Sequence, residues 1–140
     1  MKKINLDCAI IDANKKDALY IKDCLNNNHN IENVKIFKNA YDGLMFIKKN
    51  KVDLVFLNLE TPYALASREI EKDSSSLPLM VITTSNNKKC MEKHLNKQIL
   101  GCISKPLESH SINEFVINVL KIIQHNYNEP PRAIAHEVSS

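Results

Sequence analysis

Tryptophan is absent from this chain of 140 residues, and only two residues are glycine. Basic and aromatic residues are not interleaved either, so the stacking platform that binds single-stranded nucleic acid is missing. No Gly-x-Gly-x-x-Gly pattern occurs, and the segment Asp12–Lys16 has no glycine that would let the backbone approach a nucleotide or flavin phosphate. We therefore rank a flavin or nucleotide binder third among the functions considered.

The chain also lacks a long apolar run and a dense run of one charge. Its net charge is +3, and its lysines recur as isolated doublets, which are typical of solvated helix ends rather than of a nucleic-acid-binding patch. No apolar run has the length of a membrane span, and the polar segment Met1–Asp7 is too short for a signal peptide. We expect a soluble, cytoplasmic protein with no direct contact to nucleic acid or membrane.

No Cys-x-x-Cys pair is present among the four cysteines. Cys8 and Cys102 lie in apolar runs, which predicts two buried free thiols. Cys90 and His94 have the spacing of two metal ligands on one helix. Because no second pair accompanies them, we interpret them as part of an exposed helix face.

Short apolar runs alternate with helical patterns along the chain. The organising run is Leu54–Leu57, which is too short for a helix and is typical of a central strand buried on both faces. Further strands are predicted over 6–11, 34–37, 79–82 and 100–103. The spacing of apolar residues predicts helices after the caps Asn14 and Asn39, a weaker helix over 65–70, a polar one over 86–95 and a clear one over 111–125. Strands that alternate with helices indicate right-handed βαβ units, and hence an α/β three-layer sandwich around a parallel sheet.

The C-terminal residues lack the helical pattern of the preceding segment. The helical pattern fades after Asn126, and Pro130-Pro131 end any helix. We therefore divide the chain into a domain of residues 1–127 and a tail or linker of residues 128–140. A free end and a linker to an output domain would have the same composition, so both interpretations stay open.

One polar residue follows each of four predicted strands. Asp12, Asn58, Thr83 and Lys105 come after the first, third, fourth and fifth strands. Since the carboxyl ends of parallel strands are where α/β proteins gather ligands, we expect these side chains at one rim. Each alone could be an ordinary turn, cap or surface residue, so it is the set that indicates a site.

The chain resembles the response-regulator receiver domain, the CheY-like module of bacterial two-component signalling. The matching blocks cover about residues 4–125 and are Ile10-Ile11-Asp12, Asp53-Leu-Val-Phe-Leu-Asn58, Pro62, Leu77-Pro-Leu-Met-Val-Ile-Thr83 and Lys105-Pro106. The resemblance implies a flavodoxin-like fold with a five-stranded parallel sheet in the order 2-1-3-4-5. The block that ends in Asn58 is most similar to receivers that precede LytTR-type DNA-binding domains.

In that family, two adjacent acidic residues and the aspartate that ends the third strand bind Mg²⁺. That aspartate accepts phosphate from a histidine kinase, and a hydroxyl residue and a lysine contact the phosphoryl group. The resemblance places Asp12 at the first acidic position, Thr83 at the hydroxyl position and Lys105 at the lysine position. Ala13 stands at the second acidic position, and Asn58 stands at the phosphoacceptor position.

Two more positions depart from the family pattern. Ala66 replaces a glycine after the third strand, which predicts a rearranged loop because a Cβ restricts positive φ. Cys102 replaces the aromatic switch residue that reports phosphorylation. The resemblance also implies a cis peptide bond before Pro106, which turns Lys105 into the pocket.

The replacements at the site remove the anionic ligands of a divalent cation. Asp12 and Lys105 leave a net charge of about zero, against about −2 in the family pattern, and an amide oxygen is a weak substitute for a carboxylate. Asn58 is no nucleophile, because its nitrogen lone pair is delocalised into the carbonyl. We expect no cofactor, no Mg²⁺ on Asp12 and no stable aspartyl phosphate. We predict that Asp12 and Asn58 hydrogen-bond Lys105 instead.

The leading prediction is a pseudo-receiver, not an enzyme, that signals through protein contacts without phosphorylation. The resemblance implies a contact face formed by 86–95, 100–103 and 111–125, for a homodimer or a protein partner such as a histidine kinase or an output domain. The alternative is a phosphorylation- or Mg²⁺-responsive receiver that regulates a LytTR-type DNA-binding domain. We rank it second, because Asn58 before Leu59 deamidates slowly and Glu60 lies two residues past the strand end.

Overall fold

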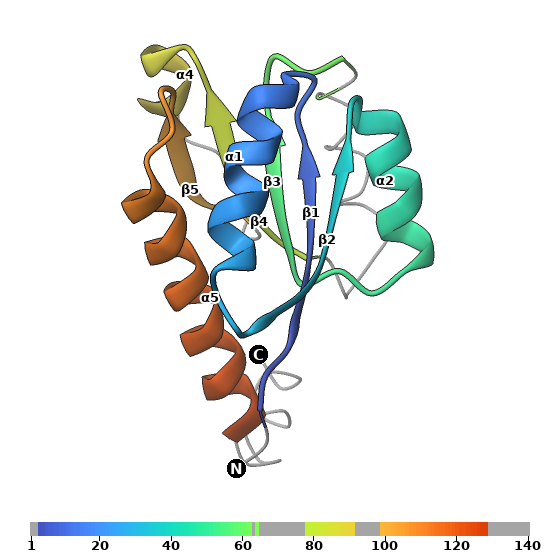
Figure 1. Ribbon diagram of the computed structural model, residues 1–140, viewed down its shortest axis with the longest axis vertical. Coiled ribbons are helices and arrows are strands. Elements are labelled where there is room, and N and C mark those ends of the chain that lie inside the picture. The colour runs from blue at the N-terminus through green and yellow to red at the C-terminus, as the bar shows by residue number, and fades with distance from the viewer. Residues whose placement is uncertain (1–2, 63, 65–77, 92–98, 129–140) are drawn as a thin grey trace, which may run out of the picture.

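The computed structural model describes residues 3–62, 64, 78–91 and 99–128. In these ranges a parallel sheet of five strands has the order β2-β1-β3-β4-β5 (Figure 1). The strands are β1 (Leu6–Ile11), β2 (Ile31–Phe37), β3 (Leu54–Asn58), β4 (Leu79–Thr84) and β5 (Ile99–Ser104). The helices are α1 (Lys15–Asn26), α2 (Ala40–Lys49), α4 (Asn87–Met91) and α5 (Ser109–Asn128). The order and the parallel direction of the strands confirm the predicted fold.

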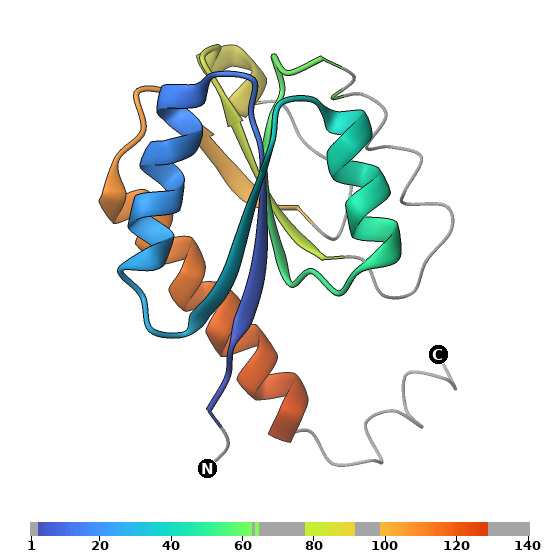
Figure 2. The same ribbon diagram turned by 45° about the vertical axis from the view of Figure 1, so that its right-hand side comes forward.

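Helices cover both faces of the sheet (Figures 1 and 2). α1 packs against α5 on one face, and α2 lies on the other. Successive side chains of a strand point to opposite faces, so β1 contributes to two clusters. Cys8 and Ile10 belong to the cluster under α1 and α5, whereas Ala9 and Ile11 belong to the cluster under α2. The result is the expected sandwich of three layers.

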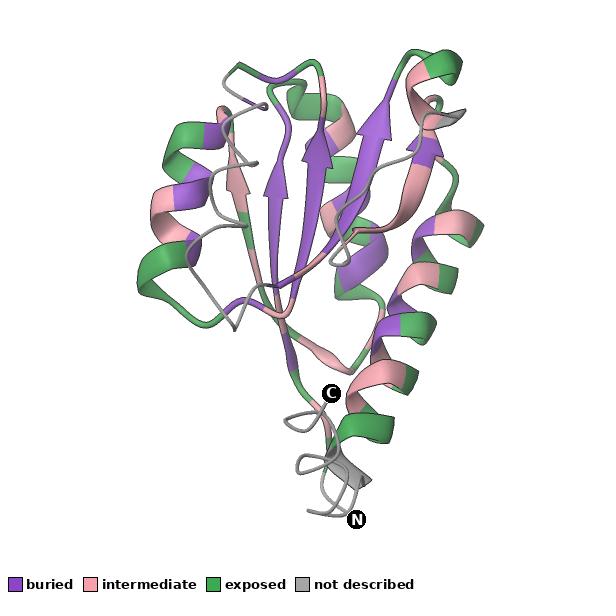
Figure 3. Ribbon diagram, turned by 180° about the vertical axis from the view of Figure 1, so that it is seen from behind, coloured by how far each residue is buried: buried purple, intermediate pink, exposed green. Residues whose placement is uncertain are grey.

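β3 is the central strand, and each of its residues is buried (Figure 3). Leu54 and Phe56 join the cluster under α1 and α5, while Val55 and Leu57 join the cluster under α2. The edge strands β2 and β5 consist mainly of half-buried and exposed residues. The apolar run at 54–57 therefore forms the doubly buried strand that its composition predicts. Asn58 is the last residue of this strand and lies at the carboxyl end of the sheet.

The helix boundaries follow from local chemistry. Asn14 and Asn39 cap α1 and α2 as predicted, since their side-chain oxygens accept hydrogen bonds from the backbone N–H groups of Asp17 at 3.0 Å and Asp42 at 2.9 Å. α5 continues to Asn128, past the predicted end at 125, because no helix-breaking residue occurs before Pro130. The predicted helix over 65–70, Ala66, the second half of the predicted helix 86–95 and the tail after Asn128 lie outside the described residues. None of the described helices is both long enough and apolar enough to cross a membrane.

α2 approaches β1 closely at Gly43. A Cβ at this position would lie 2.5 Å from Ile11 Cδ1 and 2.6 Å from Ile11 Cγ1. We expect Gly43→Ala to lower the free energy of unfolding by about 1 kcal/mol, because overpacking costs about 1–3 kcal/mol and exceeds the gain in helix propensity of about 1 kcal/mol. Urea denaturation measures the change. Lys48→Ala, at an exposed position of α2, is the control and should stay within about 0.5 kcal/mol of the wild type. A stabilised Gly43→Ala variant would contradict the close approach.

Candidate functional site

The carboxyl ends of β1, β3, β4 and β5 bring Asp12, Asn58, Thr83 and Lys105 to one rim of the sheet. Asn58 is the register partner of Thr83 across β3 and β4. Asp12 directly follows β1, whose last residue Ile11 pairs with Leu57 of β3. Asp12, Asn58 and Thr83 are 2%, 3% and 1% exposed, so each needs hydrogen-bond partners within the protein. The polar side chains at the rim are therefore expected to bond mainly to one another rather than to solvent.

Lys105 is held by two carboxylates. Its Nζ lies 3.1 Å from Asp12 Oδ2 and 2.7 Å from Asp17 Oδ2, where Asp17 belongs to the first turn of α1. Burial alone would lower the pKa of Lys105, but the hydrogen bonds to Asp17 and Asp12 outweigh it and raise the pKa above the ordinary lysine value. The Lys105–Pro106 bond is cis, the form that the resemblance implies. Lys105 is thus a permanently charged bridge between β5, β1 and α1.

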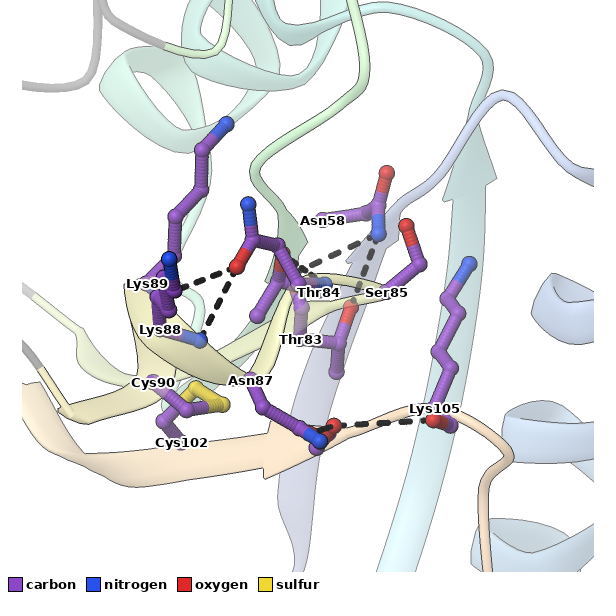
Figure 4. The surroundings of a disulfide bond; sticks show 12 residues. Asn58, Thr83, Thr84, Ser85, Asn87, Lys88, Lys89, Cys90, Cys102 and Lys105 are labelled. Atoms are coloured by element: carbon purple, nitrogen blue, oxygen red, sulfur yellow. Dashed lines mark hydrogen bonds between the residues drawn. A yellow bond between two sulfur atoms is a disulfide. The ribbon is translucent and has the colours of Figure 1, made fainter.

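Asn58 contacts its neighbours in β4 and in its own loop rather than Lys105. Its Nδ2 lies 3.4 Å from the backbone oxygen of Thr83 and 3.4 Å from Thr83 Oγ1 (Figure 4). Its Oδ1 accepts a hydrogen bond of 3.2 Å from Thr61 Oγ1. The predicted network is therefore right for Asp12 and Lys105 but wrong for Asn58. The physical reason is that Asp17, which the sequence analysis did not consider, supplies the second acceptor for the lysine.

Glu60 is a second residue whose part the sequence analysis underrated. Its Oε2 accepts a hydrogen bond of 2.6 Å from Thr84 Oγ1, and its Oε1 accepts one of 2.8 Å from the backbone N–H of Ser85. The Ser85 hydroxyl donates to the same Oε1 at 3.1 Å, and Asn58 Nδ2 lies 3.4 Å from it. Burial would raise the pKa of Glu60, but the hydrogen bonds from Thr84, Ser85 and Asn58 outweigh it and lower the pKa. Glu60 thus anchors the last residue of β4 and the start of the loop to α4. The adjacent hydroxyl residues Thr84 and Ser85 were the sequence signal that could have indicated this role.

The oxygen atoms at this rim do not match a Mg²⁺ site. Asp12 Oδ2 is paired with Lys105, and Asp12 Oδ1 accepts a hydrogen bond of 2.8 Å from the backbone N–H of Asn14. Ala13 offers no side-chain ligand, and Asn58 offers an amide oxygen in place of a carboxylate. Asp17 makes the net charge around Lys105 −1 rather than the predicted zero, since two carboxylates face one ammonium. One oxygen of each carboxylate is nevertheless paired with that ammonium.

Cys102 is not the buried free thiol that its apolar context predicts. It is half-buried and forms a disulfide with Cys90, with an S–S distance of 2.04 Å. Because β5 lies at the sheet edge, its Cys102 side chain reaches Cys90 of α4 while it also packs against the border of the cluster under α2. In the disulfide the Cys90 sulfur is not available as a metal ligand. His94, the other residue of the spacing noted above, lies outside the described residues. Cys8 is a buried free thiol as predicted, and burial together with Asp53 and Asp7 raises its pKa to about 12.

Residues 8–117 match the family described as the response regulator receiver domain. The chain belongs to that family. A comparison with curated proteins found no match. Solved structures with the same fold include the response regulatory domain of protein mrkE from Klebsiella pneumoniae, with a TM-score of 0.68, 21% identity, and coverage of 89% of this chain and 100% of that one. The signal receiver domain of a putative Luxo repressor protein from Vibrio parahaemolyticus matches with a TM-score of 0.73, 13% identity, and coverage of 91% and 100%.

A larger regulator shares the fold as well. RcsB from Salmonella enterica serovar Typhimurium, solved bound to promoter rprA in the presence of phosphomimetic BeF3-, matches with a TM-score of 0.68 and 17% identity. The match covers 84% of this chain and 62% of the RcsB chain, so this receiver spans less than two thirds of that regulator. At these identities the structures share the fold alone.

Lys105→Met should expose the dependence of Asp12 on its partner. Asp12 is 2% exposed, and a buried carboxylate without its cation is strongly destabilising, so we expect a loss of about 3 kcal/mol in the free energy of unfolding. Lys51→Met is the matched control, because Lys51 is 76% exposed and lies 3.8 Å from Asp53. It should change stability by less than about 0.5 kcal/mol. Equal losses in urea denaturation of the two variants would contradict the role of Lys105.

Glu60→Gln tests the anchor of the β4–α4 loop and its pH dependence. We expect a loss of about 1 kcal/mol at neutral pH and faster amide hydrogen exchange at Ser85, because the variant lacks the anionic acceptor. Since the folded-state pKa of Glu60 is lowered, its stabilisation is complete above the ordinary carboxyl pKa and disappears as pH falls through the lowered value. The difference between variant and wild type should therefore shrink in acid.

Glu114→Gln serves as the control, because Glu114 is 63% exposed and forms an ion pair of 3.0 Å with His110 on the exposed surface of α5. It should leave Ser85 exchange unchanged. A difference between Glu60→Gln and wild type that is constant across pH would refute the assignment.

Proposed function

We propose that this receiver domain is a pseudo-receiver that signals by protein contact without forming an aspartyl phosphate. The observation that carries the proposal is Asn58 at the end of β3, where the family places the phosphoacceptor aspartate. An amide nitrogen is not a nucleophile, and the Asn58 side chain is engaged by Thr83 and Thr61. The domain would then act as a binding module rather than as an enzyme.

Internal contacts at the rim support a state that needs neither phosphate nor Mg²⁺. The family uses the lysine after β5 to contact the phosphoryl group, but here Lys105 is bound by Asp12 and Asp17. The carboxylate of Glu60 already accepts the donors of Thr84 and Ser85 in the β4–α4 loop. Protein groups therefore take the interactions that a bound anion and cation would otherwise make.

The proposed contact face comprises α4, β5 and α5, with a second copy or another protein as its partner. β5 is an edge strand of the sheet, and Ile117 of α5 is a large apolar side chain that is 47% exposed. Edge strands and exposed apolar groups are common elements of protein interfaces. The family suggests a histidine kinase or an output domain as the partner. We propose that the contact is made in the cytoplasm.

A second candidate is a receiver that still responds to phosphate or Mg²⁺ and controls a LytTR-type DNA-binding domain. Thr83, Lys105 and the cis bond before Pro106 favour it, because these features of the family pattern are present. Asn58 and Ala13 argue against it. The two candidates differ in whether the rim binds a phosphoryl group.

Treatment with acetyl phosphate and Mg²⁺ discriminates between them. We expect the intact mass to show no added phosphoryl group, and the amide NMR signals of Asp12, Asn58, Thr83 and Lys105 to stay unchanged with Mg²⁺ and beryllium fluoride. The matched control is the double variant Ala13→Asp/Asn58→Asp, which restores both acidic positions and should gain Mg²⁺-dependent shifts. Saturable shifts in the wild type would refute the pseudo-receiver and favour the second candidate.

A further inference from the structure

Side-chain contacts link α4 to the sheet and to the rim. The structure describes this helix over Asn87–Met91. Among the described residues, the Ser104 hydroxyl donates to the side-chain oxygen of Asn87, and Lys89 Nζ lies 3.9 Å from Glu60 Oε2. Both links are polar and lie at the surface, where an ion pair contributes about 0–1 kcal/mol. A further side-chain link of α4 is covalent.

That covalent link is the disulfide between Cys90 of α4 and Cys102 of β5 (Figure 4). The two Cα atoms are 5.4 Å apart, which is within the range of natural disulfides. The bond fastens α4 to the edge strand of the sheet. It is therefore the strongest described constraint on where α4 lies.

The two cysteines of the disulfide are more exposed than the other two cysteines. Cys8 and Cys24 are 2% and 8% exposed, and burial raises the pKa of both thiols. Cys90 and Cys102 are half-buried, and Cys102 is one of the residues that line a cavity of about 250 Å³ between β5 and the start of α5. Thiol chemistry requires access and the thiolate form, so it is directed to this pair.

α4 is connected to the rim through the loop that precedes it. The Thr84 hydroxyl accepts a hydrogen bond of 3.1 Å from the backbone N–H of Asn86 and donates one of 2.6 Å to Glu60. Ser85 donates its N–H to the same carboxylate, which also lies 3.4 Å from Asn58 Nδ2. A shift of α4 would therefore change the hydrogen bonds of Glu60 at the end of β3.

We propose that Cys90 and Cys102 form a reversible redox modification site that controls the position of α4. The disulfide state holds α4 against β5, and the dithiol state releases α4 and loosens the Glu60 contacts in the β4–α4 loop. The inference rests on the proposed function in two respects: α4 and β5 belong to the proposed contact face, and the protein is taken to be cytoplasmic. Disulfides in that compartment are rare, and those that form are mostly transient or redox-sensing.

The oxidant is a peroxide, and the reductant is a dithiol. In oxidation, one thiolate attacks a peroxide oxygen, the O–O bond breaks, and a sulfenic acid and water form. The second thiolate attacks that sulfur, the S–S bond forms, and a second water leaves, so two thiols and H₂O₂ give one disulfide and two waters. In reduction, a thiolate of the dithiol attacks the disulfide, and its second thiol resolves the mixed disulfide. Two electrons and two protons then reside on Cys90 and Cys102.

Alkylation of the folded wild-type protein tests whether the site is reversible. After treatment with dithiothreitol, iodoacetamide should label Cys90 and Cys102, identified by peptide mass, and should leave Cys8 and Cys24 unlabelled. In a second reduced sample, dithiothreitol is removed and hydrogen peroxide is added before iodoacetamide, and Cys90 and Cys102 should then not be labelled. A pair that stays unlabelled after reduction, or that is labelled after re-oxidation by peroxide, overturns the proposal.

Amide hydrogen exchange tests whether the site controls α4. In the dithiol form, exchange of residues 87–91 and of Ser85 should be at least tenfold faster than in the disulfide form, whereas β1 and β3 should be unchanged. Cys90→Ser/Cys102→Ser should match the dithiol form without reductant, and Cys24→Ala should match the disulfide form. Equal exchange in the two redox forms overturns the control of α4.

Failure of the pseudo-receiver proposal has a different signature. If acetyl phosphate labels both redox forms while their exchange rates at α4 still differ, the pseudo-receiver is wrong and the redox site stands. If acetyl phosphate labels neither form and exchange at α4 is equal in both, the redox site is wrong and the pseudo-receiver stands.

Discussion

The ion pairs of Lys105 with Asp12 and Asp17 are the contacts on which the rim of this domain depends. Asp12 is buried directly after β1, where an isolated carboxylate would be strongly destabilising. Lys105 reaches it from the end of β5, and Asp17 adds a second acceptor from α1. The Lys105 side chain thus contacts one residue that is 93 positions earlier in the sequence, Asp12, and one that is 88 positions earlier, Asp17. Because the lysine is committed to this bridge, Asn58 finds its partners in Thr83 and Thr61 instead.

A second anchor lies on the α4 side of the same rim. Glu60 gathers hydrogen bonds from the β4–α4 loop, and the disulfide fastens α4 to β5. The polar side chains around Asn58 thus form hydrogen bonds and ion pairs with one another. In this receiver domain the arrangement links the end of β3 to α4 through direct side-chain contacts of Glu60.

Much of the fold could be predicted from local patterns. The apolar run at 54–57 specifies a doubly buried strand, and Asn14 and Asn39 specify helix starts, because each signal depends on residues a few positions apart. The placement of Asp12, Asn58, Thr83 and Lys105 at one rim follows from the same patterns, since parallel strands end at one edge. The contact of Asp17 with Lys105 and the contacts of Glu60 with Thr84 and Ser85 were not predicted. Local sequence does not show which residue of a helix turn or a loop faces a side chain that is distant in the sequence.

The sequence by itself determined the order of strands and helices, the receiver family and the residue types at the ends of the strands. The order of the elements depends on periodicity, capping and composition, and the family was indicated by the resemblance of short sequence blocks; both can be found along the chain. Only the tertiary structure decided that Cys102 pairs with Cys90 rather than lying free in the core, and that Lys105 binds Asp17 rather than Asn58. Both outcomes depend on the strand register and on how helices pack over an edge strand. Such distances arise only when the whole sheet has assembled.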